Sequence, residues 1–485
     1  MASADTRDET SGRQTNEVAK LIQGLAVVWS ADPTRIGEVL LLDETPRVFG
    51  RGGPEGSDGR ARAALLRQRP SDNQPRQEIE LPSMSRAQLE LRVERGAVRV
   101  ENLGKRALLD AEGRPAPSLL LTRVGESFEV KGQFVFVRVD REPELAPLRS
   151  LEQPKFPFGE SDSHGFVGES PLAWSMRDQC AFVAARAAHV LVLGESGSGK
   201  ELVAQSIHAA SKRGRRAMVA RSAATIPAGL ADAELFGNLA NYPNPGMPER
   251  RGLVGEADGT TLFLDEIGEL PEELQARLLR VLDERGEYHR LGESRGRTAN
   301  LRLIGATNRA ISTLKHDVAA RFRLRLTVPG LNERREDIVL IARHLLRRIA
   351  TEDAEIASRF LDRSGATVEP RISSTLARAL TRHTYRAHCR ELEALLWRSI
   401  ATSQGDELEL TAEVLGDLAG EATSVPSSRR ATQELSIEEV RAALERANGV
   451  QERAWRELGL ANRYVLKRLI AKMGLSSADR GDDEP

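Results

Sequence analysis

Short apolar runs separated by turn residues dominate the first third of the chain. Strands are predicted at Ala26–Trp29, Val39–Leu42, Arg47–Phe49, Glu78–Leu81, Leu89–Val93, Ala97–Val100, Ser118–Leu121, Phe128–Val130 and Phe134–Val139. Many short strands without a helical period indicate an all-β sandwich. Residues 52–77 are polar and rich in Gly, Pro and Arg, so we expect a long loop there.

The pattern changes after a proline-rich stretch at 141–165, which predicts a linker. Residues 166–335 alternate apolar strands with helical periods, the signature of an α/β parallel sheet. Residues 336–420 are predicted to be helical throughout, and a second linker follows at 421–433. The expected architecture is therefore multidomain: a disordered tail at 1–20, a β-sandwich at 21–140, an α/β core with a helical lid, a small all-α unit at 434–476 and an acidic tail at 477–485.

Composition narrows the class of protein. The 485 residues are enough for two to four domains, and 70 Lys plus Arg balance 71 Asp plus Glu. A neutral balance exerts no global attraction on nucleic acid, so any DNA contact needs a local basic patch. The two cysteines suit a reducing compartment. The N-terminal residues are polar and no apolar run approaches membrane-spanning length, so we expect a cytoplasmic protein without a membrane contact.

A glycine-rich turn joins the apolar run Val190–Leu193 to a helical pattern, and it has the spacing of a phosphate-binding loop. Glycines let successive N–H groups point at an anion, the following helix adds its positive end, and Lys200 supplies a mobile charge. Glu201 occupies the position where a Mg²⁺-binding Ser or Thr is usual. The expected nucleotide-binding residues are Gly194, Glu195, Ser196, Gly197, Ser198, Gly199, Lys200 and Glu201.

A second apolar run, Thr261–Leu264, ends in two carboxylates, Asp265 and Glu266. We expect this strand to lie beside the phosphate-loop strand, with its end at the same crevice. Asp265 would then hold Mg²⁺ and Glu266 would polarise the attacking water. The two segments together predict a site that binds a nucleotide and Mg²⁺, and that can hydrolyse the nucleotide.

The last fifty residues predict three short helices, at Leu435–Ala447, Val450–Leu458 and Arg463–Met473, with a turn at Gly459–Asn462. A helix–turn–helix with glycine in the turn is a DNA-reading arrangement. Six basic residues and one acid lie between Arg453 and Lys472. The candidate DNA contacts are Asn462, Arg463, Tyr464, Lys467, Arg468 and Lys472. A dimerisation unit with a solvated basic face is the alternative.

Several local sequences within 165–420 resemble the AAA+ domain of sigma-54-dependent transcriptional activators. These are Glu234–Gly237, Ala257–Gly259, Leu262–Leu270, Leu278–Leu282, Gly305–Arg309 and Arg390–Glu393. The C-terminal unit is similar to the Fis-type domain of the same family. The resemblance implies a DNA-bound regulator that forms dimers up to hexamers and hydrolyses ATP at subunit interfaces to remodel sigma-54 RNA polymerase at an upstream promoter element. It also implies roles for Asn308 as γ-phosphate sensor, Arg321 as the finger reaching a neighbour's ATP, and Arg390 as second sensor.

The sequence departs from that family at positions that couple ATP hydrolysis to the sigma-54 factor. The family's Gly-Ala-Phe-Thr-Gly-Ala loop, which touches the sigma factor, is replaced by Asn241–Gly246, with two prolines that fix φ and remove donors. Ser222 stands where an Asn restrains the catalytic Glu, and Lys315 stands where a first finger Arg is usual. Tyr385-Arg-Ala-His388 replaces Trp-Pro-Gly-Asn before the second sensor.

The N-terminal unit resembles a forkhead-associated (FHA) domain, on the basis of Phe49–Arg51, Met84–Arg86 and Asn102–Gly104. That resemblance implies phosphothreonine binding by Arg51 and Ser85, with Arg86 helping, and a partner from a Ser/Thr kinase pathway. Gln88 replaces a usual His, and Ala107 or Leu108 a usual Asn. The alternative is a degenerate sandwich that only packs on a partner.

Two functions follow. In the first, an FHA-controlled AAA+ ATPase remodels sigma-54 polymerase. In the second, a DNA-bound, ATP-binding regulator or scaffold no longer contacts sigma-54, because its loop has changed.

Overall fold

The computed structural model describes residues 21–52, 60–76, 78–151, 155–283, 285–365 and 367–423, together with Arg441 and Arg446. Contacts divide the chain into two units, residues 1–411 and 412–485. Helix α11 (Ala412–Thr423) opens the second unit. The predicted tail at 1–20 lies outside the described residues, as does almost all of the predicted helix–turn–helix unit. Within the described part of the chain, no helix combines the length and apolar character needed to cross a membrane.

Residues 22–141 form two antiparallel sheets. Their strands are β1 (Ile22–Ser30), β2 (Val39–Leu42), β3 (Arg47–Phe49), β4 (Leu65–Arg69), β5 (Asp72–Arg76), β6 (Leu89–Glu94), β7 (Ala97–Asn102), β8 (Leu108–Leu109), β9 (Ser118–Leu121), β10 (Ser127–Val130) and β11 (Phe134–Arg141). One sheet has the order β5-β4-β2-β1-β11-β10-β8 and the other β3-β6-β7-β9. Buried side chains from both sheets, among them Leu25, Phe49, Val98 and Phe136, share one core, so the predicted two-sheet sandwich is present.

One loop prediction and one strand prediction in this unit were wrong. The segment 52–77, expected to be a loop, contains the hairpin β4–β5, and the predicted strand Glu78–Leu81 makes only an isolated bridge from Ile79 to Gly52. The hairpin was not predicted because its residues are mostly polar and form no apolar run. Ion pairs from Arg67 and Arg76 to the fully buried Glu38, at 3.2 and 3.5 Å, hold it to the sandwich, and such long-range partners leave no local pattern.

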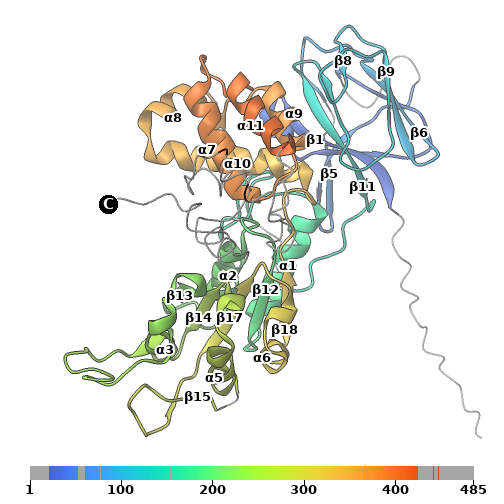
Figure 1. Cartoon of the computed structure of the whole chain (residues 1–485). Helices are drawn as coiled ribbons and strands as arrows, with labels where there is room; N and C mark the ends of the chain where they lie inside the picture. Colours follow the sequence, from blue (N-terminus) through green and yellow to red (C-terminus); the bar gives the residue numbers. More distant parts are fainter. Residues whose placement is uncertain are drawn as a thin grey trace, which may run out of the picture. The chain divides into compact units, whose positions relative to one another are not determined.

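The α/β core is built on a five-stranded parallel sheet with the order β13-β14-β17-β12-β18. The strands are β12 (Val190–Leu193), β13 (Val219–Ser222), β14 (Thr261–Asp265), β17 (Arg302–Thr307) and β18 (Leu324–Thr327), and β15 (Glu287–Tyr288) pairs with β16 (Arg297–Thr298) in a separate hairpin. The helices are α1 (Pro171–Ala184), α2 (Lys200–Ala209), α3 (Ala231–Phe236), α4 (Gly252–Glu256), α5 (Glu272–Leu282) and α6 (His316–Arg321). Figure 1 shows β12, β14, β17 and β18 side by side.

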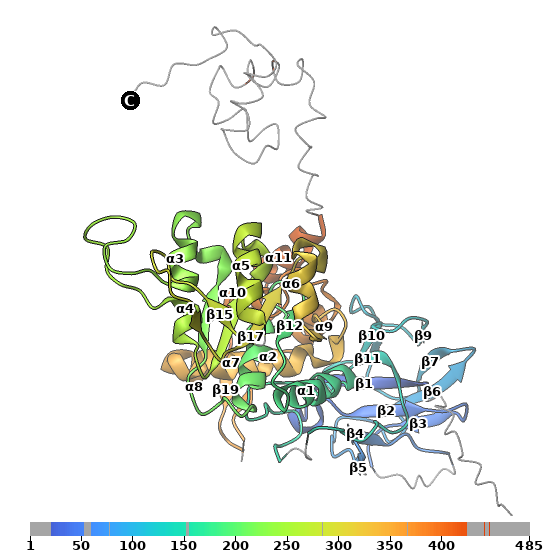
Figure 2. The same ribbon diagram turned by 90° about the horizontal axis from the view of Figure 1, so that it is seen from below.

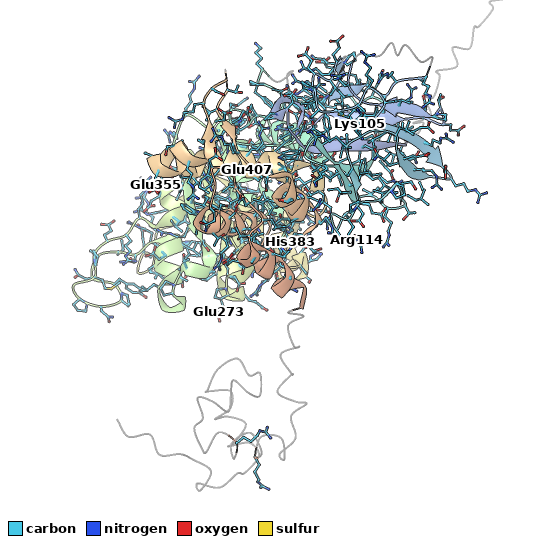
Figure 3. The ribbon with its side chains drawn as sticks, turned by 90° about the horizontal axis from the view of Figure 1, so that it is seen from above. Lys105, Arg114, Glu273, Glu355, His383 and Glu407 are labelled. Carbon is cyan, nitrogen blue, oxygen red and sulfur yellow. The ribbon has the colours of Figure 1, made fainter. Side chains whose placement is uncertain are left out.

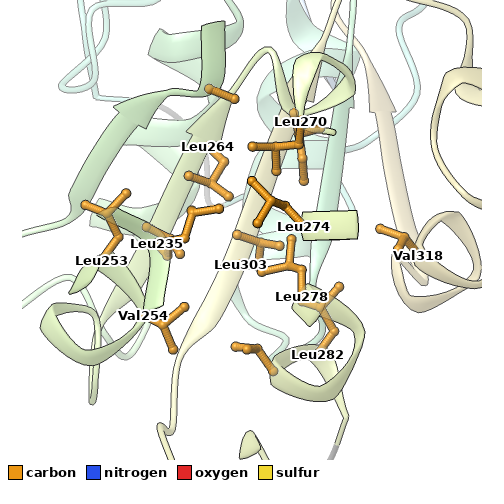
Figure 4. Close-up of a cluster of buried hydrophobic side chains, with 14 of the residues drawn as sticks. Leu235, Leu253, Val254, Leu264, Leu270, Leu274, Leu278, Leu282, Leu303 and Val318 are labelled. Carbon is orange, nitrogen blue, oxygen red and sulfur yellow. The ribbon is translucent and has the colours of Figure 1, made fainter. Parts of the chain in front are cut away.

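Each face of this sheet is covered by a different set of helices. Helices α1 and α2 pack on one face through side chains such as Met176, Val203 and Ile207. Helices α3 to α6 cover the other face, where Leu278 and Leu303 lie in a cluster of leucines and valines (Figure 4). Figure 2 shows the neighbouring helices α5 and α6 of this layer.

The expectation that the two nucleotide strands are neighbours was wrong. Strand β17 lies between them, since it pairs with β12 on one side and with β14 on the other. All three strands run parallel, so their carboxyl ends still meet at one edge of the sheet. Strand order depends on contacts between distant residues, and the apolar runs by themselves carry no information on it.

Residues after the sheet form a mainly helical lid. Its helices are α7 (Ile338–Glu352), α8 (Ala354–Phe360), α9 (Ser374–Arg382) and α10 (His388–Thr402). A short hairpin, β19 (Leu361–Asp362) with β20 (Glu369–Pro370), interrupts them, so the prediction of helix throughout 336–420 was wrong at this point. Short 3-10 turns connect elements along the chain at Pro33–Arg35, Ala223–Thr225, Ala228–Leu230, Ile267–Glu269, Ile311–Thr313 and Arg335–Asp337.

Candidate functional site

The glycine-rich turn connects β12 to α2, as its spacing predicts. Gly199 is the residue before the helix, with a φ of 103°, and no side chain caps the helix start. Nζ of Lys200 donates to the carbonyl oxygens of Gly194 and Glu195 at 2.9 and 2.8 Å. Burial lowers the pKa of Lys200, while the nearby Asp265 acts in the opposite direction. The ammonium is therefore held over the loop by contacts that an incoming anion can replace.

Two features of the loop fit a bound polyphosphate. The first turn of α2 has N–H groups without a capping side chain, which is a ready anion site. Oγ of Ser198 is buried and has no hydrogen-bond partner. A buried hydroxyl without a partner is costly unless a ligand satisfies it. Among the described residues, no group of three or more His, Cys, Asp or Glu side chains gathers for a metal ion.

Asp265 and Glu266 lie at the carboxyl end of β14, at the same sheet edge as the phosphate loop. Glu266 has a left-handed backbone, with a φ of 53°, a strained conformation for a residue that is not glycine. Its carboxylate accepts a 3.3 Å hydrogen bond from Oγ of Ser222, at the end of the adjacent strand β13. Asn308 directly follows β17 and is exposed at this edge. Three neighbouring strands therefore present polar side chains at the same edge of the sheet.

The lid meets the phosphate loop at the first turn of α10. Nη1 of Arg390 donates to Oγ of Ser196 at 3.1 Å, so the predicted second-sensor residue lies on the loop. His388 and Glu195 are also paired, at 2.7 Å. Sequence reasoning missed this pair and the unpartnered Ser198 hydroxyl. The only signal was the presence of His388 in the segment that departs from the family pattern.

Arg321 lies away from its own phosphate loop. It ends α6 and precedes β18, whereas Lys200 follows β12. Because the strands run parallel, the start of β18 and the end of β12 lie at opposite ends of the strands. Arg321 is paired with Asp283 at 2.9 Å and lines a cavity of about 1070 Å³ together with His189, Arg280 and Arg323. The structure thus places Arg321 and the phosphate loop at opposite ends of the parallel strands.

The segment that replaces the family's sigma-contact loop is tied down by amide side chains. Nδ2 of the buried Asn238 donates to the carbonyls of Leu239 and Pro248, at 2.9 Å each. Oδ1 of Asn241 accepts from the N–H of Gly246 at 2.8 Å. Gly292, on the hairpin loop between β15 and β16, faces the ring of Tyr242, because a Cβ at this glycine would lie 2.7 Å from the ring. The loop is thus held against a second loop, with Tyr242 43% exposed.

The three sandwich segments singled out from the sequence come together. The N–H of Arg51 donates to the carbonyl of Ser85 at 2.9 Å, and Oγ of Ser85 accepts from the N–H of Lys105 at 3.0 Å. Arg86 is exposed beside them. Gly50 permits this approach, because a Cβ there would lie 2.2 Å from the carbonyl oxygen of Arg86. An arginine and a hydroxyl therefore share one loop cluster, and Figure 3 labels Lys105 within it.

Gln88, at the position where FHA domains usually have a His, holds this loop cluster together. The side chain is fully buried, and Nε2 donates to Oδ1 of Asn102 and to the carbonyl of Arg106 at 2.8 and 2.9 Å. Its Oε1 accepts from the N–H of Ser85 at 3.4 Å. Gln88 therefore ties Ser85, Asn102 and Arg106 to one another within the cluster.

The candidate DNA contacts lie outside the described residues. These are Asn462, Arg463, Tyr464, Lys467, Arg468 and Lys472.

Comparison with known proteins agrees with the geometry of the α/β core. Residues 166–328 match the family described as the sigma-54 interaction domain. The transcriptional regulatory protein ZraR of Klebsiella oxytoca is 34% identical over 317 residues, which cover 63% of this chain and 68% of that protein. The Nif-specific regulatory protein of Azotobacter vinelandii is 35% identical over 315 residues, 62% of this chain and 58% of that protein.

A solved structure of NtrX from Brucella abortus in complex with ADP is 27% identical in sequence, with a TM-score of 0.46. The match covers 64% of this chain and 70% of the NtrX chain. The relation to ZraR spans more than two thirds of that regulator at over 30% identity, and the family match includes the phosphate loop and β14. The chain therefore belongs to the sigma-54-dependent transcriptional activators and carries their AAA+ ATPase domain.

Proposed function

We propose that this protein hydrolyses ATP in a ring of identical subunits and uses the energy to remodel sigma-54 RNA polymerase. The observation that carries the proposal is the convergence of Lys200, Asp265, Glu266 and Arg390 on one edge of the sheet. A Mg²⁺-bound ATP would supply the transferable phosphoryl group and the charge that draws these side chains together.

The position of each residue indicates its role in ATP binding or hydrolysis. Lys200 and the uncapped start of α2 bind the phosphates. Asp265 orients the cation, and Glu266 accepts the proton of the attacking water. Asn308, at the end of β17, senses the outer phosphate. Arg321 lies at the far edge of its own sheet, so it would serve the site of a neighbouring subunit, where a cation stabilises charge on the transferred group.

The sandwich would act as a phosphoprotein sensor of the FHA type. Arg51, Ser85 and Arg86 offer the guanidinium and hydroxyl groups that bind a dianionic phosphate. The binding loops are supported from within by Gln88. A phosphothreonine protein from a Ser/Thr kinase pathway is the proposed partner.

The sandwich has direct contacts with the lid through which its signal could pass. Nε1 of Trp29 donates to the carbonyl of Ile372 at 2.6 Å. The buried Glu129 accepts from Oγ of Ser374 at 2.8 Å and pairs with Arg378, both on α9. Because α10 of the same lid contacts the phosphate loop, a change at the sandwich can reach the nucleotide. DNA binding by the C-terminal helix–turn–helix residues completes the proposed activator.

A second candidate function keeps the ATPase and loses the sigma contact. The specific observation in its favour is the Asn241–Gly246 loop, which lacks the family sequence and is fastened by Asn238 and Asn241. In that case the protein would be a DNA-bound, ATP-dependent regulator or scaffold with another partner.

One pair of assays tests the proposal and separates the two candidates. Purified full-length protein is assayed for ATP turnover and for open-complex formation by sigma-54 polymerase, with Glu266→Gln as the matched inactive variant. The proposal predicts turnover and open complexes in the wild type only. Turnover without sigma-54 binding in a transition-state analogue supports the second candidate, and equal turnover in the wild type and Glu266→Gln overturns the catalytic assignment.

A further inference from the structure

The first turn of α10 is packed directly on the phosphate loop. The N–H of Cys389 donates to the carbonyl of Gly197 at 3.1 Å, next to the Arg390–Ser196 hydrogen bond. The carbonyl oxygen of Ala387 approaches so closely that a Cβ at Gly197 would lie 2.0 Å from it. The loop and the lid therefore touch through backbone as well as side chains.

His388 occupies the centre of this contact. Its side chain is only 2% exposed, and its backbone is left-handed, with a φ of 46°. The N–H of Leu331 donates to Nδ1 at 3.2 Å, so Nδ1 carries a lone pair. The proton of a neutral ring is then on Nε2, which donates to Oε2 of Glu195 at 2.7 Å. Both ring nitrogens have a defined partner.

These two partners belong to different parts of the molecule. Leu331 lies on the segment that leads from β18, which ends at Thr327, into the lid. Glu195 lies on the phosphate loop, and its side chain is 72% exposed. Gly330 makes room for the ring, because a Cβ there would lie 2.4 Å from Cε1 of His388. A single imidazole therefore joins the connecting segment, the lid helix and the phosphate loop.

We propose that His388 is a positioning residue that holds the lid, and with it Arg390, over the phosphate loop through Glu195. This inference rests on the proposed ATPase function and deepens it. The pair organises the lid side of the site before the nucleotide arrives, which reduces the ordering cost of binding. Asp265 ends β14 and Glu266 directly follows it, whereas the ring of His388 has its hydrogen bonds with Leu331 and Glu195. Loss of the pair should thus weaken nucleotide binding more than it slows the chemical step.

The test is a double-mutant cycle with His388→Ala, Glu195→Ala and the double variant in the full-length protein. For each, KM for ATP and kcat are measured, and the Kd for ADP is measured by titration calorimetry. We expect each single variant to raise KM and Kd about tenfold, with kcat changed by less than about threefold. The double variant should be no weaker than either single variant, because both remove the same interaction. His388→Gln, whose amide keeps a donor for Glu195, should restore most of the affinity.

His383→Ala is the control, because His383 lies on the same lid segment, directly after α9, and pairs with Glu391. This variant should lower the unfolding temperature while changing the Kd for ADP by less than about threefold. Equal losses in His383→Ala and His388→Ala, or additive losses in the double variant, would overturn the inference. The ADP titration does not depend on turnover. If the wild type binds ADP but does not hydrolyse ATP, the proposed function is refuted, and the Kd values of the variants still decide the role of His388.

Discussion

Oγ of Ser222 lies 3.3 Å from Oε2 of Glu266 and donates to it, across the neighbouring strands β13 and β14. The family carries an Asn at the position of Ser222 that restrains the catalytic Glu. A serine hydroxyl at this distance provides one weak hydrogen bond to Glu266, and we propose that it restrains this carboxylate less than an amide would.

We predict that Ser222→Ala raises basal ATP turnover roughly twofold, because a weak hydrogen bond to the carboxylate contributes on the order of 0.5 kcal/mol. Glu266→Gln should lower turnover by at least about a hundredfold and leave ADP binding unchanged. Steady-state phosphate release measures the first effect and calorimetry the second. A fall in turnover in Ser222→Ala would show that the hydroxyl assists Glu266 instead of restraining it.

Phosphopeptide binding should depend on the loop cluster around Ser85. Arg51→Ala and Ser85→Ala are each expected to weaken binding of a phosphothreonine peptide at least about tenfold, since each removes a charge-assisted contact. Fluorescence polarisation with phosphorylated and unphosphorylated peptides measures this. Arg114→Ala is the control, because Arg114 lies on a separate, exposed turn of the sandwich (Figure 3). Equal binding of the two peptides would contradict the assignment.

The junction between sandwich and lid contains a buried ion pair whose loss should be costly. The side chains of Glu129 and Arg378 are 2% and 11% exposed. Glu129→Ala leaves the arginine without its partner, for which we expect a loss of about 3–5 kcal/mol. Denaturant unfolding measures this loss. Replacement of both residues by apolar ones, Glu129→Leu with Arg378→Met, should recover much of it, and an equally unstable double variant would refute this account.

Leu278, on α5, is fully buried against β14 and β17 in the cluster of Figure 4. Leu278→Ala is expected to destabilise the α/β core by about 2–5 kcal/mol, because it removes apolar contacts and leaves a cavity. Thermal unfolding followed by circular dichroism measures the change. Leu415→Ala is the matched control, since this leucine is 53% exposed and its truncation should have little effect.

Acidification should destabilise the protein through His189. Burial lowers the pKa of this histidine to about 4, and its Nδ1 accepts a 3.0 Å hydrogen bond from the N–H of Leu303. Between the ordinary value of 6.5 and about 4, the unfolded chain takes up a proton at His189 that the folded chain does not. Stability should therefore fall as pH falls through this window. His189→Asn should show a smaller fall in unfolding temperature from pH 7 to pH 4.5, and an unchanged profile would contradict the assignment.

Prediction from sequence succeeded where short segments carry their own chemistry. The turn from Gly194 to Lys200 needs only its own residues to curl around an anion, and the structure places it between a strand and a helix as expected. The strand ending in Asp265 and Glu266 was likewise visible as an apolar run followed by carboxylates. Prediction failed for the β4–β5 hairpin, because its support is the buried Glu38 on another strand.

The sequence by itself determined the phosphate loop, the acidic strand end and the change at Asn241–Gly246, since each is a property of consecutive residues. Only the tertiary structure decided that β17 separates β12 from β14, that Ser222 reaches Glu266, and that His388 reaches Glu195 from 193 positions away. Those relations depend on how strands and lid pack against one another. Packing is a sum of many weak contacts between distant residues, and no local pattern encodes it.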